Sequence, residues 1–142
     1  MKFVSGNSED DIGKWLANFY KENTGLKLYM PYSAIGAHDN FNLIGVAIFT
    51  DYNGSNIELH GYGPGCFTRK SIKYLFNYVF NELGCNILRA RPSIKNKKAI
   101  RMLCKLGFKI ECKLDDYIDK NEDAIMYKYK RSWAKRWINV ST

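Results

Sequence analysis

The sequence has no apolar run long enough to cross a membrane. Its longest stretch of apolar residues and glycine, Leu43–Phe49, spans seven positions, whereas a membrane-spanning helix needs about 20. The first ten residues include acidic side chains and lack the apolar segment of a signal peptide. We therefore expect a cytoplasmic protein with no membrane contact.

Closely spaced metal ligands are also missing. The four cysteines stand at positions 66, 85, 104 and 112, and none of them forms a C-x-x-C pair. A structural zinc site usually shows ligand pairs with two to four residues between them, and disulfide frameworks are typical of secreted chains. We expect no metal site and reduced cysteines that serve packing.

Linkers, repeats and low-complexity segments are absent, so the 142 residues are expected to form one domain. Acidic residues are few, because 14 of them stand against 22 basic residues and leave a net charge of +8. The basic residues concentrate in 95–113 and 128–142, and five acids lie between them in 115–123. The excess favours an anionic partner. The acidic segment either attracts a cationic amine or is a solvated turn.

Hydrophobic periodicity predicts a mixed α/β fold. Ser8 as N-cap and an apolar face at i, i+3, i+4, i+7 and i+8 predict a helix that ends near Gly25. That face comprises Ile12, Trp15, Leu16, Phe19 and Tyr20. Strands are expected at 33–38, 42–51 and 57–62, with an Asn53-Gly54 hairpin before the last. A helix at about 68–83, a strand at 87–91, a helix at about 95–106 and strands at 108–114 and 124–129 follow.

A glycine-rich loop, Gly61–Gly65, stands between a predicted strand and a predicted helix. Glycine lets the backbone turn sharply and approach a ligand, and the free N–H groups at a helix start are a natural seat for phosphate. An ordinary helix cap with solvated basic residues is the structural alternative.

The second half of the chain resembles the GNAT superfamily of acetyl-CoA-dependent N-acetyltransferases. A strand is followed by Asn96-x-x-Ala99 on a helix and by Lys105-Leu106-Gly107-Phe108 before the next strand. Residues 80–84 resemble the branch that includes ribosomal-protein acetyltransferases, and residues 58–69 resemble small, often phage-encoded members. The likeness covers about residues 40–137. It implies one α/β (α+β) domain, 1–142, in which a mostly antiparallel central sheet is flanked by helices.

The resemblance implies an acyltransferase that moves an acetyl group from acetyl-CoA to a primary amine by direct attack in a ternary complex. It places a cofactor-binding core at about 57–108 and a basic tail at about 130–142. The implied coenzyme A contacts are amides at the helix start for the pyrophosphate, an asparagine beside the pantetheine and basic residues near the 3′-phosphate. Carried over to this chain, they are Cys66, Phe67, Thr68, Arg69, Lys70, Ser71, Asn96, Lys98 and Arg101.

The chain departs from the family pattern at two places. The Arg/Gln-x-x-Gly-x-Gly/Ala motif would align with residues 61–66, where its leading residue and both glycine positions are changed. The tyrosine that often acts as general acid is replaced by Leu103, which leaves the acid unassigned. The acceptor is expected to be an amine-bearing protein or small molecule, and the oligomeric state is not predicted.

Glu58 and His60 are the candidate catalytic residues. Because they stand two positions apart on a strand, they project to one face. An ammonium group must lose a proton before it can attack, so a base is required. His60 has the better unperturbed pKa, and Glu58 stands where the family often has its carboxylate base. A covalent route through Cys66 is a weaker alternative, since a helix start and nearby basic residues would lower the pKa of its thiol.

A non-enzymatic nucleic-acid-binding domain is the alternative function. It rests on the net charge, on the basic segment 95–113 and on a tail in which Trp133 and Trp137 stand beside Lys135 and Arg136. Basic and aromatic residues together suit phosphate contacts and base stacking. No helix-turn-helix, zinc-finger or ribonucleoprotein motif is present, so nucleic acid is not the favoured partner.

Overall fold

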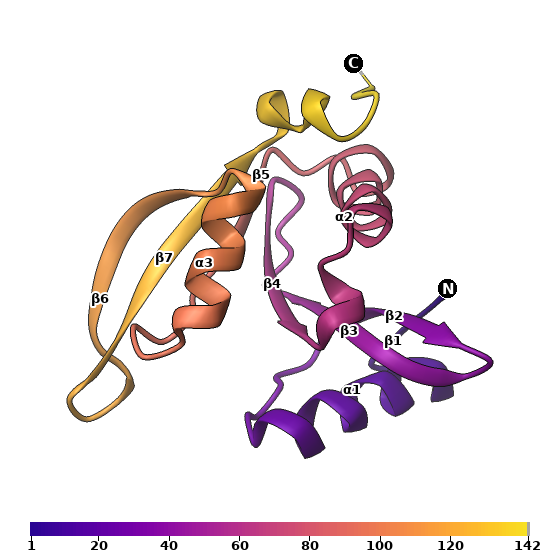
Figure 1. Ribbon diagram of the computed structural model, residues 1–142, viewed down its shortest axis with the longest axis horizontal. Helices are drawn as coiled ribbons and strands as arrows, with labels where there is room; N and C mark the ends of the chain where they lie inside the picture. The colour runs from indigo at the N-terminus through magenta and orange to yellow at the C-terminus, as the bar shows by residue number, and fades with distance from the viewer. Residues whose placement is uncertain (142) are drawn as a thin grey trace.

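The structure, a computed structural model, describes residues 1–141. Seven strands form one sheet in the order β1-β2-β3-β4-β5-β7-β6, and the helices cover its two faces (Figure 1). All neighbouring strands are antiparallel except β4 and β5. The strands are β1 Lys2–Asn7, β2 Ser33–Asp39, β3 Asn42–Thr50, β4 Asn56–Tyr62, β5 Ile87–Ala90, β6 Lys109–Asp119 and β7 Glu122–Lys130. The predicted fold class is confirmed.

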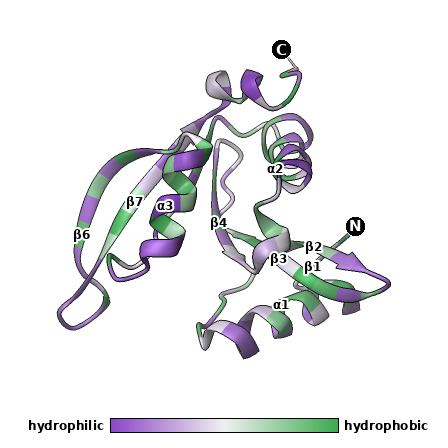
Figure 2. Ribbon diagram, viewed as in Figure 1, coloured by the Kyte–Doolittle hydropathy of each residue, from purple (hydrophilic) through white to green (hydrophobic). Residues whose placement is uncertain are grey.

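Three helices pack on this sheet and divide the core in two. They are α1 Asp11–Thr24, α2 Arg69–Phe76, which continues as a π-helical stretch over Asn77–Glu82, and α3 Lys97–Leu106. The buried face of α1 packs with β2 and β3 in one cluster, while α2 and α3 share the larger cluster with β4, β5 and β7. Hydrophobic and hydrophilic residues alternate around the turns of α1 and α3, as this packing requires (Figure 2). Short 3₁₀ helices span Pro64–Cys66 and Arg131–Arg136.

Four details differ from the sequence prediction. An additional strand, β1, precedes α1 and pairs with β2. The N-cap of α1 is Asp10, whose carboxylate accepts from the Gly13 amide at 2.7 Å, rather than Ser8. Ile12 and Trp15, expected in the core, are 45% and 38% exposed. Most of the acidic segment belongs to the outer half of β6, which continues to Asp119.

The sheet opens between β4 and β5. Their parallel ladder runs only from Asn56 opposite Ile87 to Glu58 opposite Arg89, although β4 continues to Tyr62. After β5 the chain passes through Pro92 to α3 and leaves the last residues of β4 beside a gap in the sheet. Within residues 1–141, no helix is both long and apolar enough to cross a membrane.

Candidate active site

An inner cavity of about 240 Å³ fills the opening between β4 and β5. Its walls come from Leu59–Gly61 of β4, from residues 90–93 and from the α3 side chains Ala99 and Leu103. Several of these side chains are small or absent, because Gly61, Ala90 and Ala99 line the space. These small side chains leave the space between the two diverging strands open, and this space is called the slot below.

An outer cavity of about 730 Å³ lies on the other side of the same strands. It is lined by the connection 26–31 after α1, by residues 50–52 at the end of β3 and by residues 117–118 of β6. Five residues line both cavities: Tyr20, Leu26, His60, Arg91 and Ile118. The two spaces therefore meet at His60 and Arg91, where a group in one can approach a group in the other.

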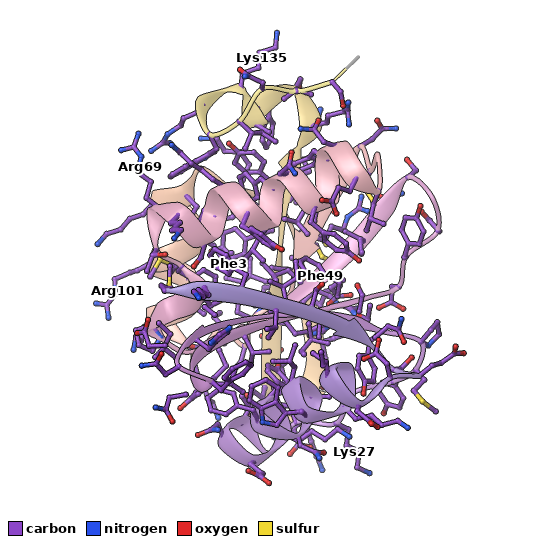
Figure 3. The ribbon with its side chains drawn as sticks, turned by 90° about the vertical axis from the view of Figure 1, so that its right-hand side faces the viewer. Phe3, Lys27, Phe49, Arg69, Arg101 and Lys135 are labelled. Atoms are coloured by element: carbon purple, nitrogen blue, oxygen red, sulfur yellow. The ribbon has the colours of Figure 1, made fainter. Side chains whose placement is uncertain are left out.

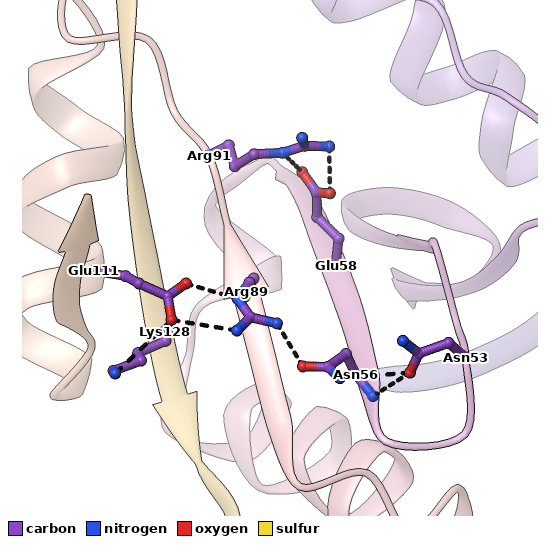
Figure 4. A network of polar contacts seen from close by, with 7 residues as sticks. All are labelled: Asn53, Asn56, Glu58, Arg89, Arg91, Glu111 and Lys128. Carbon is purple, nitrogen blue, oxygen red and sulfur yellow. Dashed lines mark hydrogen bonds and ion pairs between the residues drawn. The ribbon is translucent and has the colours of Figure 1, made fainter. Parts of the chain in front are cut away.

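Glu58 is buried beneath the outer cavity, where it pairs with Arg91. It is 6% exposed, and its two carboxylate oxygens accept from Nε and Nη2 of Arg91 (Figure 4). Burial raises the pKa of the Glu58 carboxyl, and the bonds from Arg91 partly offset this. Arg91 also lies 3.8 Å from the exposed carboxylate of Asp51. A carboxylate with a raised pKa at a cavity is suited to accept a proton.

A second polar network braces the paired ends of β4 and β5. The Arg89 guanidinium donates to Glu111 at 2.7 Å and 3.2 Å and to Asn56, and Lys128 lies 3.8 Å from Glu111 (Figure 4). These contacts link β4, β5, β7 and β6 at the level where the β4–β5 ladder ends. They hold the strands together just below the point at which the sheet opens.

His60 is neutral and oriented by the end of β3. Burial, assisted by the nearby Arg91 charge, lowers the pKa of its imidazole to about 4. His60 Nε2 lies 2.8 Å from Thr50 Oγ1, and that hydroxyl donates to Asp51 Oδ2 at 3.1 Å. Since the hydroxyl proton is used by Asp51, His60 Nε2 donates to Thr50 and carries the imidazole proton. Nδ1 then remains as an acceptor.

Only two of the nine predicted cofactor-binding residues, Phe67 and Asn96, line the inner cavity. The Asn96 side chain also caps α3, because its Oδ1 accepts from the Ala99 amide at 3.2 Å. Arg69 and Arg101 project outward from the same side of the molecule (Figure 3). Lys70 donates to the Met1 carbonyl at 3.0 Å, and Lys98 is exposed on the first turn of α3.

Thr68 and Ser71 are occupied by the cap of α2. Thr68 Oγ1 accepts from the Ser71 amide at 3.1 Å, and the buried Ser71 hydroxyl donates to the Gly65 carbonyl. The Ser71 amide is thus engaged within the protein, which leaves the earlier amides of this turn for a ligand.

The structure corrects two expectations about the glycine-rich loop. Cys66 is 3% exposed, and burial raises the pKa of its thiol to about 12 instead of lowering it. Gly65 is buried against β3, where a Cβ would lie 2.5 Å from Ile44 Cγ1. Glycine is needed here for packing of the loop on β3 rather than for access to a ligand. The covalent route through Cys66 loses its physical basis.

Both tryptophans of the C-terminal segment pack against the larger core cluster. Trp133 also has its carbonyl bound by the hydroxyl of Tyr129 at 2.9 Å. Both rings are therefore partly buried, which leaves less of each ring exposed for stacking on a base.

Sequence reasoning missed Tyr20, Thr50 and Arg91 as members of the site. Tyr20 was part of the predicted apolar face of the first helix, and its ring does pack in the core, at 4% exposed. Arg91 ended a predicted strand and carried no motif. Only the neighbours that the sheet provides distinguish these residues from ordinary core and strand positions.

Comparison with known proteins places this architecture in a class. No family model matches the chain, and no curated protein matches its sequence. Mutant forms of the spermidine/spermine N-acetyltransferase SpeG from Vibrio cholerae align with a TM-score of 0.74 at 15% identity, over 95% of this chain and 99% of that one. A chimera of that enzyme and hSSAT aligns with a TM-score of 0.75 at 16% identity, over 96% and 99% of the two chains. The chain has the fold of N-acetyltransferases, and the predicted GNAT-like fold is confirmed.

A further similar structure is that of yncA from Salmonella typhimurium, which contains its cofactor acetyl-CoA. It aligns with a TM-score of 0.60 at 16% identity, over 85% of this chain and 73% of its own. At these identities the likeness concerns the fold, and the chemistry must be argued from the residues of this chain.

Proposed function

We propose that this protein transfers an acetyl group from acetyl-CoA to a primary amine by direct attack in a ternary complex. The observation that carries the proposal is the meeting of two cavities at His60 and Arg91. A direct transfer needs two ligands to be held at the same time with their reacting atoms in contact. The inner slot suits a thin, extended group, and the larger outer cavity suits an acceptor.

The residues around the inner cavity fit coenzyme A. The small side chains of Gly61, Ala90 and Ala99 leave the slot open for an unbranched arm. Arg69 and Arg101 lie outside the lining of this cavity, project from one side of the molecule and are exposed, so they are available to phosphates (Figure 3). When bound, acetyl-CoA supplies a thioester whose acetyl carbon forms a bond to the amine nitrogen as the carbon–sulfur bond breaks.

Glu58 is the proposed proton acceptor. Its carboxylate lines the outer cavity, and burial raises its pKa toward that of a useful base. His60 is proposed to orient the amine, because its free Nδ1 can accept one amine N–H once the ammonium has lost its proton. With a pKa of about 4, His60 is too weak a base to remove that proton itself.

Tyr20 is the proposed proton donor. It would take the role of the tyrosine that often acts as general acid in the family, since this chain has Leu103 at that tyrosine's position. It lines both cavities, and burial raises the pKa of its phenol to about 12, so Oη keeps its proton at neutral pH. That proton is available to the departing sulfur, which leaves as a thiol. Leu103 lines the inner cavity, and its side chain carries no proton that could serve.

The first test is binding of acetyl-CoA, followed by amine-dependent thiol release. Ligand at 100 times Kd should stabilise the fold by about 2.7 kcal/mol, which a thermal-shift assay detects. No shift at millimolar acetyl-CoA, together with tight, salt-dependent binding to DNA or RNA, would reject the proposal in favour of the nucleic-acid alternative.

A further inference from the structure

Half of the exposed large hydrophobic residues of the described chain surround the outer cavity. Twelve such side chains are exposed, and six of them line this one space. The six are Leu26, Tyr29, Met30, Tyr52, Tyr117 and Ile118. Isolated apolar residues on a surface are ordinary, whereas a gathered patch marks a binding site.

These six residues come from three segments that are far apart in the sequence. Tyr29 and Met30, at 76% and 75% exposed, belong to the connection after α1, whereas Tyr52 follows β3 and Tyr117 lies on β6. The Tyr117 ring lies 4.7 Å from the Arg91 guanidinium, which holds one wall of the patch beside the site. The fold thus assembles an aromatic surface directly above the proposed reaction centre.

The charges that line the outer cavity balance one another. Two residues are cationic, Lys27 and Arg91, and two are anionic, Asp51 and Glu58. Arg91 is bonded to Glu58, and Asp51, which lies 3.8 Å from Arg91 and whose side chain is 70% exposed, is the lining carboxylate that a cation can reach from solvent. One exposed carboxylate suits one ammonium group, whereas a molecule with several ammonium groups would require several carboxylates.

We propose that the acceptor is a small molecule with a single amine and an aromatic or similarly large apolar body, and not a polyamine. This inference rests on the proposed acetyl transfer. The apolar body would lie against Tyr29, Tyr52 and Tyr117, while the ammonium group would lie between Asp51 and His60. A cavity of about 730 Å³ is of the size that holds such a molecule.

The test compares 2-phenylethylamine with spermidine as acceptors for the full chain, by the rate of thiol release from acetyl-CoA. We expect kcat/KM to be at least 10-fold higher for 2-phenylethylamine. Tyr29→Ala should raise KM for 2-phenylethylamine several-fold, leave kcat unchanged and have no effect with ethylamine, which has no ring. Tyr74→Ala, at an exposed tyrosine of α2 outside the cavity, is the matched control.

The outcomes separate this inference from the proposed function. Acetylation of spermidine, or of a peptide N-terminus, with an equal or higher kcat/KM would overturn the acceptor class and leave acetyl transfer intact. If acetyl-CoA binds but no amine is acetylated, calorimetry with 2-phenylethylamine on the coenzyme A complex decides, because lack of binding also overturns the class. Failure to bind acetyl-CoA at all would instead reject the proposed function.

Discussion

The inner cavity is lined mainly by regular structure, whereas the outer cavity is lined mainly by connections. Gly61 on β4 and Ala99 on α3 are held by the sheet and by helix packing. The outer walls come instead from residues 26–31, from the end of β3 and from the irregular outer half of β6. Segments outside regular elements can change without disturbing the core. The inner cavity is therefore a feature of the fold, whereas the outer cavity, which is the proposed acceptor site, is formed by segments that can vary.

Glu58→Gln should cause the largest loss of activity, and it should act at the outer cavity alone. Removing the proton acceptor is expected to lower kcat by about 1000-fold, with the affinity for coenzyme A unchanged. Since the ionised carboxylate is required, the wild-type rate should rise with pH through the raised pKa of Glu58. Steady-state rates across pH and calorimetry test both statements, and Asp115→Asn, at an exposed carboxylate, is the control. A variant of normal kcat would exclude Glu58 as the base.

Ala99→Trp should block the inner cavity alone. An indole at this lining position would occupy the slot, so affinity for coenzyme A should fall by about 100-fold, or about 2.7 kcal/mol. Lys105→Trp, at an exposed position of the same helix, should bind normally. Calorimetry, with circular dichroism to confirm folding, gives the answer. Equal affinities for the two variants would show that the cofactor does not enter this slot.

His60→Gln examines the point at which the two cavities meet. The pKa of the imidazole is about 4 in the folded chain against 6.5 without its surroundings, so the unfolded state binds more protons between these pH values. Wild-type stability should therefore decrease by about 2 kcal/mol between pH 7 and pH 5 through this residue, with the decrease continuing toward pH 4. The glutamine variant should lack this component. Urea unfolding of both proteins at pH 7 and pH 5 measures this component. If the free energy of unfolding decreased equally in the wild type and in the variant, His60 would not be desolvated.

Tyr20→Phe should lower kcat by about 10-fold, which is less than the roughly 100-fold or more of a general acid that cannot be replaced, because water can take over part of the proton donation. The ring remains in place, so stability and cofactor affinity should change little. Comparison of thiol-release rates with amines of different basicity is the measurement, and Tyr62→Phe, on a residue outside both cavities, is the control. An unchanged kcat would assign proton donation to water.

Arg69→Ala should have the smallest effect, because its charge lies in solvent outside both cavities. A screened, exposed charge contributes less than about 1 kcal/mol, so affinity for coenzyme A should fall only about threefold at low salt. The difference should vanish at 0.5 M salt. Lys135→Ala, on the C-terminal 3₁₀ helix, should bind like wild type at either salt concentration.

Local sequence patterns predicted most elements of the second half of the chain. Asn96 and Gly107 flank α3 as its N-cap and C-cap, and the predicted helix 95–106 differs from the observed one by two residues. The Asn53-Gly54 pair stands in the connection between β3 and β4, as predicted. These signals act over a few residues. By contrast, no such local signal marks β1, and this strand depends on its pairing with β2, about 30 residues later in the sequence.

Of the site, the sequence alone determined that Glu58 and His60 share a strand and that a glycine-rich loop leads into α2. Only the tertiary structure decided that Arg91 bonds Glu58, that Thr50 orients His60 and that Cys66 is buried. The reason is physical. Hydrogen bonds, charge pairs and burial depend on which strands are neighbours, and β4 meets β5 across a helix and a crossover, where the ladder ends after three residues.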